Sequence, residues 1–112
     1  PRADGAYAGI GEGSFQEVPV LGIPILLRRC LSAGPLQSLS QPGRCTAIAP
    51  GTLQMATTGD EGWAEFSSLR EGIYETYANV AGSEYLAPSP PFLLVRIMGP
   101  GALVERVLQV TR

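Results

Sequence analysis

The chain has 112 residues, enough for one domain with a single two-layer core. Hydrophobic residues make up 45% and charged residues 16%, which excludes a disordered chain, and a net charge of −2 without a basic stripe excludes a nucleic-acid-binding surface. There is no histidine and no lysine, so the commonest general base, the commonest metal ligand and all lysine chemistry are excluded. Fourteen glycines and ten prolines, spread along the chain, favour short strands over helices, and no apolar run approaches the length of a membrane span.

Residues 1–14 are glycine-rich and predict a turn or a loosely held edge segment. The first strong strand pattern follows over 23–30, where Pro24 marks a strand start or a sheet edge because proline cannot donate a ladder hydrogen bond. Period-two alternation gives this strand one face with Ile25, Leu27 and Arg29 and another with Leu26, Arg28 and Cys30.

The two cysteines, Cys30 and Cys45, stand near the ends of a stretch rich in Ser, Gly and Pro, 31–50. In a secreted protein, two cysteines most simply form one disulfide. Closing a loop of this length would stabilise the fold by on the order of 3 kcal/mol. Two reduced buried cysteines and a redox pair are the alternatives, although the spacing is not that of a C-x-x-C motif. We expect 31–50 to be a disulfide-closed loop.

The stretch 57–78 has the pattern of a β-hairpin, with a polar turn, a strand over 63–66, a second glycine-bearing turn and a strand over 73–78. The last strand has Tyr74, Thr76 and Ala78 on one face and Ile73, Glu75 and Tyr77 on the other. Further strand patterns cover 52–56, 92–97 and 103–110. The whole chain, 1–112, is therefore predicted to be a single all-β domain, a two-sheet antiparallel β-sandwich of about seven strands.

The central stretch resembles the B-type repeat of collagen adhesins and related domains of sortase-assembled pilins from Gram-positive bacteria. The matching residues are Asp60-Glu61-Gly62, Phe66 and the run Leu69-Arg70-Glu71-Gly72-Ile73-Tyr74. The segment 22–27 resembles the first strand of these domains, and 87–95 resembles the segment before their closing strands, so the resemblance covers roughly residues 18 to 110. It implies a prealbumin-like, inverse-immunoglobulin fold, a location at the cell surface or cell wall after secretion, and no cofactor. It also implies a non-catalytic structural role in a pilus or adhesin, with neighbouring pilin or adhesin domains as partners and no membrane insertion of this segment.

One feature of that family is missing. Many members carry an internal isopeptide bond from a lysine, and this chain has none. The position at which the assisting acidic residue would fall is about Ala78, next to Asn79, the only asparagine. We hypothesise that a Cys30–Cys45 disulfide supplies the covalent staple instead.

A binding module of a secreted protein is the alternative function, with a glycan or a host protein as its partner. The candidate surface consists of Trp63, Tyr77 and Tyr85, because aromatic faces stack on sugars and contribute strongly to interfaces. A simpler interpretation places Trp63 in or near the core, which leaves Tyr85, in a predicted loop, as the best candidate for an exposed ring.

Catalysis is the third possibility. Five carboxylates lie close in sequence and could act as an acid–base pair or hold calcium: Asp60, Glu61, Glu65, Glu71 and Glu75. Turn carboxylates are usually solvated, so we expect no catalytic residues and no metal site.

Overall fold

The computed structural model describes the backbone of residues 5–12, 18–38, 40–87, 91–98 and 103–111. It describes the side chains of 19–38, 40–87, 91–98, 108, 110 and 111. Ten strands lie in these ranges, and the seven with four or more residues are β1 (Gly5–Glu12), β3 (Pro24–Ser32), β6 (Gln54–Thr57), β7 (Trp63–Phe66), β8 (Gly72–Ala78), β9 (Leu93–Ile97) and β10 (Leu103–Val110). The short ones are β2 (Val18–Pro19), β4 (Ser40–Pro42) and β5 (Ala47–Ile48). The all-β class is confirmed, and none of the described residues belongs to a helix that could cross a membrane.

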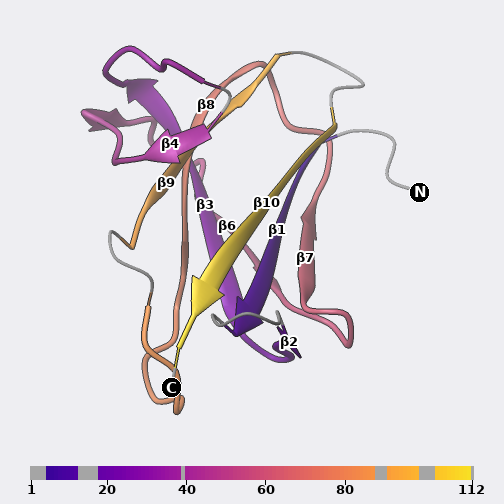
Figure 1. Cartoon of the computed structure of the whole chain (residues 1–112). Helices are drawn as coiled ribbons and strands as arrows, with labels where there is room; N and C mark the ends of the chain where they lie inside the picture. Colours follow the sequence, from indigo (N-terminus) through magenta and orange to yellow (C-terminus); the bar gives the residue numbers. More distant parts are fainter. Residues whose placement is uncertain (1–4, 13–17, 39, 88–90, 99–102, 112) are drawn as a thin grey trace.

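Six of these strands form an antiparallel sheet (Figure 1) in the order β4-β9-β8-β3, with β5 and β6 both on the far side of β3. β6 pairs with the first half of β3, and β5 pairs with its last residues, where the register shifts between Cys30 and Ser32. The long strand β3 is thus held on both sides along most of its length, by β8 on one side and by β6 and β5 on the other.

The other four strands pair around β1. β1 is antiparallel to β7 and β2, but it runs parallel to β10 over all eight of its residues, and Figure 1 shows the two strands side by side. The expectation that every pairing is antiparallel is wrong here. The edge position expected for 1–14 is also wrong for its described part, because β1 is hydrogen-bonded on both sides. Glycine lowers strand propensity, yet pairing on both sides overrides that local preference.

One core draws side chains from both groups of strands, including Ile25 of β3, Phe66 of β7, Ile97 of β9 and Val110 of β10. The alternation predicted for β8 is confirmed on its core face, where Tyr74, Thr76 and Ala78 are all buried. The hydroxyl of Thr76 donates to the carbonyl of Leu26 across the strand pair at 3.0 Å, so its burial leaves no unpaired hydroxyl.

The segment 31–50 is more ordered than a simple loop. It contributes β4 to one edge of the six-stranded sheet and β5 to the other side of β3. It therefore covers part of the sheet face opposite the core. The candidate functional site lies beneath this cover.

Candidate functional site

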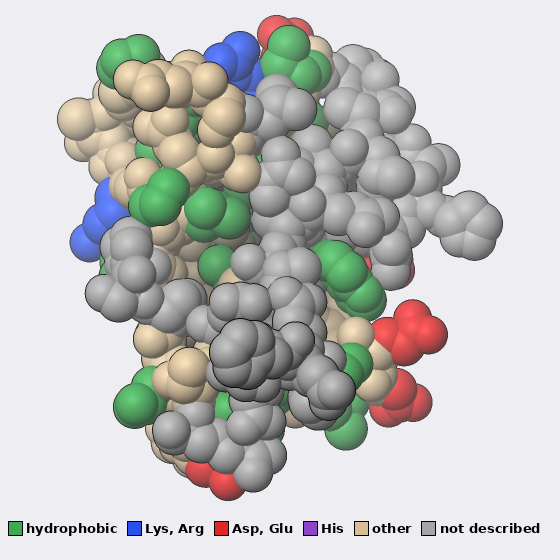
Figure 2. Space-filling view, viewed as in Figure 1, with side chains coloured by type: hydrophobic (Ala, Val, Ile, Leu, Met, Phe, Trp, Pro, Cys, Tyr) green, Lys and Arg blue, Asp and Glu red, His purple; other side chains and the backbone are tan. Residues whose placement is uncertain are grey.

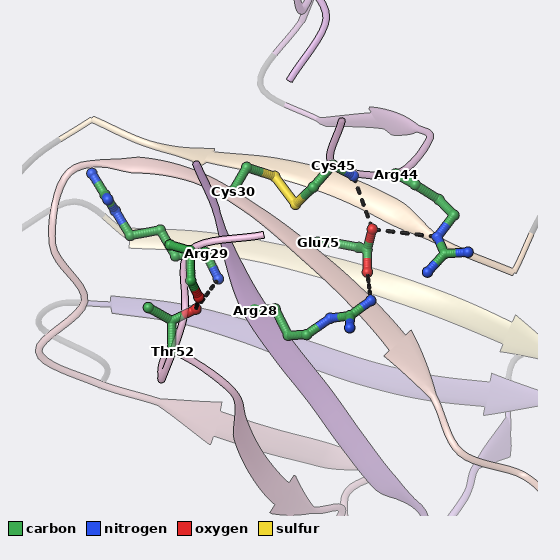
Figure 3. The surroundings of a disulfide bond; sticks show 8 residues. Arg28, Arg29, Cys30, Arg44, Cys45, Thr52 and Glu75 are labelled. Atoms are coloured by element: carbon green, nitrogen blue, oxygen red, sulfur yellow. Dashed lines mark hydrogen bonds and ion pairs between the residues drawn. A yellow bond between two sulfur atoms is a disulfide. The ribbon is translucent and has the colours of Figure 1, made fainter. Parts of the chain in front are cut away.

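A disulfide joins Cys30, near the end of β3, to Cys45, in the segment between β4 and β5 (Figure 3). The Cα atoms lie 5.1 Å apart and the two residues are 15 positions apart in the chain. The predicted disulfide is confirmed, and Cys30 is buried beneath the covering segment. Because free cytoplasmic thiols are kept reduced, such a bond is typical of an extracellular or otherwise oxidising compartment.

Glu75 of β8 lies next to this bond on the sheet face opposite the core, and it is 1% exposed. Three groups surround its carboxylate. Arg28, its register partner on β3, forms an ion pair with Oε1; the Nε of Arg44 lies 3.4 Å from Oε2; and the backbone N–H of Cys45 donates to Oε2 at 2.8 Å. The cluster therefore needs both β8, which carries Glu75 on its outward face, and the disulfide-closed segment, which carries Arg44 and Cys45.

Two opposing effects act on the pKa of the Glu75 carboxyl. Desolvation by burial raises it, whereas the hydrogen bonds from Arg28 and from the Cys45 N–H, with the charges of Arg28 and Arg44, lower it. The pKa is therefore held below its ordinary value, and Glu75 is a buried anion at neutral pH. A carboxylate enclosed by two cations and a backbone donor is not available as a base.

Aromatic side chains extend this cover. The guanidinium of Arg44 lies 4.0 Å from the centroid of the Phe92 ring, and the rings of Phe92 and Tyr77 are tilted with centroids 5.0 Å apart. Gly43 lies over Leu94, which is buried although it faces away from the core. The segment that carries Cys45 is thus fixed to the sheet by covalent, ionic and apolar contacts together.

At the same end of the sheet, on the face that packs against the core, the run 69–74 forms a tyrosine corner. The hydroxyl of Tyr74 donates to the carbonyl of Arg70 at 2.9 Å, a bond to the backbone a few residues upstream that is typical of β-sandwich domains. Nη2 of Arg29 donates to the carbonyl of Glu71 at 3.1 Å. Gly72, at a φ of 153°, lies so close to Arg29 that a Cβ would be 2.8 Å from its Nε. This geometry explains physically why the run needs both Gly and Tyr at these positions.

Arg28 and Arg29, although adjacent in the sequence, therefore have different roles. Figure 3 shows Arg28 directed toward Glu75 and Arg29 directed to the opposite side of β3. Beside Arg29, a pocket of about 240 Å³ opens between the turn after β5 and the tyrosine corner.

The three aromatic residues of the predicted binding surface are not brought together. Tyr77 lies on β8 against Phe92. Trp63 lies on β7, which belongs to the other group of strands, and is half-buried. Tyr85 packs against the core with part of its ring. Their positions on different elements do not support a single aromatic platform.

The five carboxylates singled out from the sequence are also dispersed. Glu75 is buried, whereas the other four are exposed: Asp60 and Glu61 share one turn, Glu65 lies on β7 and Glu71 precedes β8. Among the described residues, no three metal-ligating side chains of the His, Cys, Asp and Glu types gather in one place. On the face seen in Figure 2, the charged side chains that are described lie apart near the rim rather than in one patch.

Comparison of the chain with models of protein families, with curated proteins and with solved structures gave no match.

Proposed function

We propose that this chain is a structural, non-catalytic domain of a secreted, cell-surface-anchored pilus or adhesin protein. In this proposal the two groups of strands are the sheets of a prealbumin-like β-sandwich. The observation that carries it is the Cys30–Cys45 disulfide, which fixes a covering segment to β3, the most extensively paired strand of the six-stranded sheet. A disulfide of this kind persists outside the cytoplasm, where such proteins act.

Two further observations support a load-bearing role. The buried ion cluster at Glu75 links β3, β8 and the disulfide-closed segment. Separating any two of these three elements would leave a buried charge without one of its partners. The tyrosine corner ties the turn before β8 to that strand. In a chain without lysine, these contacts and the disulfide take the place of the isopeptide bond expected from the resemblance.

Force spectroscopy of tandem copies tests the role directly. With the disulfide formed, the chain between Cys30 and Cys45, which are 15 positions apart, cannot extend under load. Reduction should then lengthen each unfolding step by roughly 50 Å, since an extended residue spans about 3.3–3.6 Å, and should lower the unfolding force. Steps of equal length and force in both states would show that the disulfide bears no load, which contradicts the proposal.

A second candidate is a carbohydrate- or protein-binding accessory module of a secreted protein. The pocket beside the tyrosine corner, lined by two arginines, is the observation that favours it.

A further inference from the structure

The pocket beside the tyrosine corner differs in charge from the rest of the chain. The protein as a whole has a net charge of −2, yet Arg29 and Arg70 both line this pocket and no carboxylate does. Neither arginine forms a salt bridge with any described residue. A concave site with two guanidinium groups and no counter-charge is a site for an anion.

Both positive charges influence the hydroxyl of Tyr74. Burial raises the pKa of the Tyr74 hydroxyl, and the charges of Arg29 and, to a smaller extent, Arg70 oppose that effect, so both guanidinium groups act on the same hydroxyl. Nη2 of Arg29 donates to the carbonyl of Glu71, and the covered Nε of Arg29 has no acceptor among the described residues. The site therefore has more donors than acceptors.

One wall of the pocket is fixed in advance. The hydroxyl of Thr52 accepts the backbone N–H of Arg29 at 3.1 Å and donates to the carbonyl of Ala49 at 2.7 Å, which fastens the turn after β5 to β3. The opposite wall is fixed by the bond from Tyr74 to the carbonyl of Arg70. Neither of these bonds uses the guanidinium of Arg70, which remains exposed at the rim.

The other polar residues that line the pocket indicate which kind of anion it binds. Gln54 and Ser68, both exposed at the rim, each offer a donor and an acceptor, which is what the hydroxyl groups of a sugar require. The amide groups of an acidic peptide can bond the same two side chains, so a peptide-like acid is the competing ligand in the test. The volume of about 240 Å³ lies below the roughly 300–1,000 Å³ typical of pockets for drug-sized ligands, and so it suits a single ring.

We propose that this pocket binds an acidic sugar, a single ring with one carboxylate, with the carboxylate between Arg29 and Arg70 and the ring hydroxyls on Gln54 and Ser68. Planar guanidinium groups bind carboxylates through paired hydrogen bonds, which gives geometric selectivity as well as affinity. This role adds ligand binding to the proposed structural function and does not depend on it, since the pocket lies on the other side of β3 from the disulfide cluster.

The test is an amide NMR titration of the oxidised chain with D-glucuronate, with neutral D-glucose as the control ligand and N-acetylglutamate amide as the peptide-like acid. We expect saturable shifts at 51–54 and 68–74 with glucuronate and no saturation with glucose. Arg70→Gln removes the charge but keeps the backbone carbonyl that Tyr74 uses, and it should weaken glucuronate binding about tenfold or more. Arg96→Gln, the same change on the opposite sheet face, should leave the affinity unchanged.

Three results would overturn the proposal: no saturable shifts with glucuronate, equal weakening by Arg70→Gln and Arg96→Gln, or tighter binding of the glutamate derivative than of glucuronate. Arg70→Lys gives a further check, because it keeps the charge and loses the planar fork. It should bind glucuronate more weakly than the parent and more tightly than Arg70→Gln. Failure of this titration would leave the force experiment on the disulfide unaffected, so the two proposals can fail separately.

Discussion

Replacement of Arg28 by methionine tests the buried ion cluster most sharply. The substitution keeps an apolar stem on β3 but removes the ion-pair partner of Glu75, a carboxylate that has no exposed surface of its own. The carboxylate would then be left with the Cys45 N–H and the more distant Arg44. A buried charge without its main partner is costly, so the folded state should be destabilised.

The magnitude follows from the burial of each group. Removing one member of a fully buried ion pair costs about 3–5 kcal/mol. Here Arg28 retains 26% of its side-chain exposure, and two other groups still compensate Glu75. We therefore expect a loss of about 2–3 kcal/mol, which corresponds to a decrease in Tm of roughly 8–12 °C for a domain of this size. Arg44, at 59% exposure, should matter much less, by about 1 kcal/mol or below.

The assay is urea and thermal unfolding of the oxidised protein at neutral and acidic pH, with Arg96→Met as the matched control. Because the pKa of Glu75 is lowered in the folded state, its ionised form contributes stability above its unfolded pKa, near 4.3, and this contribution is lost as pH falls through the folded pKa. The difference between the parent and Arg28→Met should therefore be largest at pH 7 and shrink on acidification. A loss no greater than that of the control, or one independent of pH, would show that Arg28 does not stabilise the Glu75 carboxylate.

Three further predictions follow from the same contacts. Cys30→Ser/Cys45→Ser should lower the free energy of unfolding by on the order of 3 kcal/mol in urea titrations, and an unchanged midpoint would contradict it. Gly72→Ala should cost about 1–3 kcal/mol, because Gly72 has a φ of 153° and an added Cβ would clash with the Arg29 guanidinium. The control Gly34→Ala, which has open space around it, should change Tm little. Equal effects of the two substitutions would count against this geometry of the tyrosine corner. Tyr74→Phe should cost about 1 kcal/mol and remove one high-pH ionisation from an alkaline absorbance titration, because burial raises the pKa of Tyr74. An unchanged titration curve would disprove this assignment.

Local patterns predicted the parts of the fold that depend on neighbouring residues. Alternation located β3, β7 and β8, and it assigned Tyr74, Thr76 and Ala78 to one face, which proved to be the core face. The cysteine count also favoured the disulfide correctly. The strand faces follow from side-chain periodicity, and the disulfide follows from the chemistry of cysteine alone.

The features that were missed depend on contacts between distant segments. Alternation placed Glu75 away from Tyr74, correctly, but could not show that the segment 40–46 would cover it and bring Arg44 within reach. The glycine content of 1–14 indicated an edge, whereas β1 is paired on both sides, because β10, from the other end of the chain, aligns with it in parallel. The pocket was missed for the same reason: Arg29, Gln54 and Arg70 come from three separate segments.

The intact mass of the purified chain shows whether a Cys30–Cys45 disulfide staples this domain. Mass spectrometry before and after reduction, with alkylation at each stage, would count the free thiols. We expect a chain lighter by two hydrogens than its fully reduced form, and alkylation of both cysteines only after reduction. Two thiols that alkylate without reduction, in protein prepared under oxidising conditions, would contradict the staple and remove the main support for an extracytoplasmic structural domain.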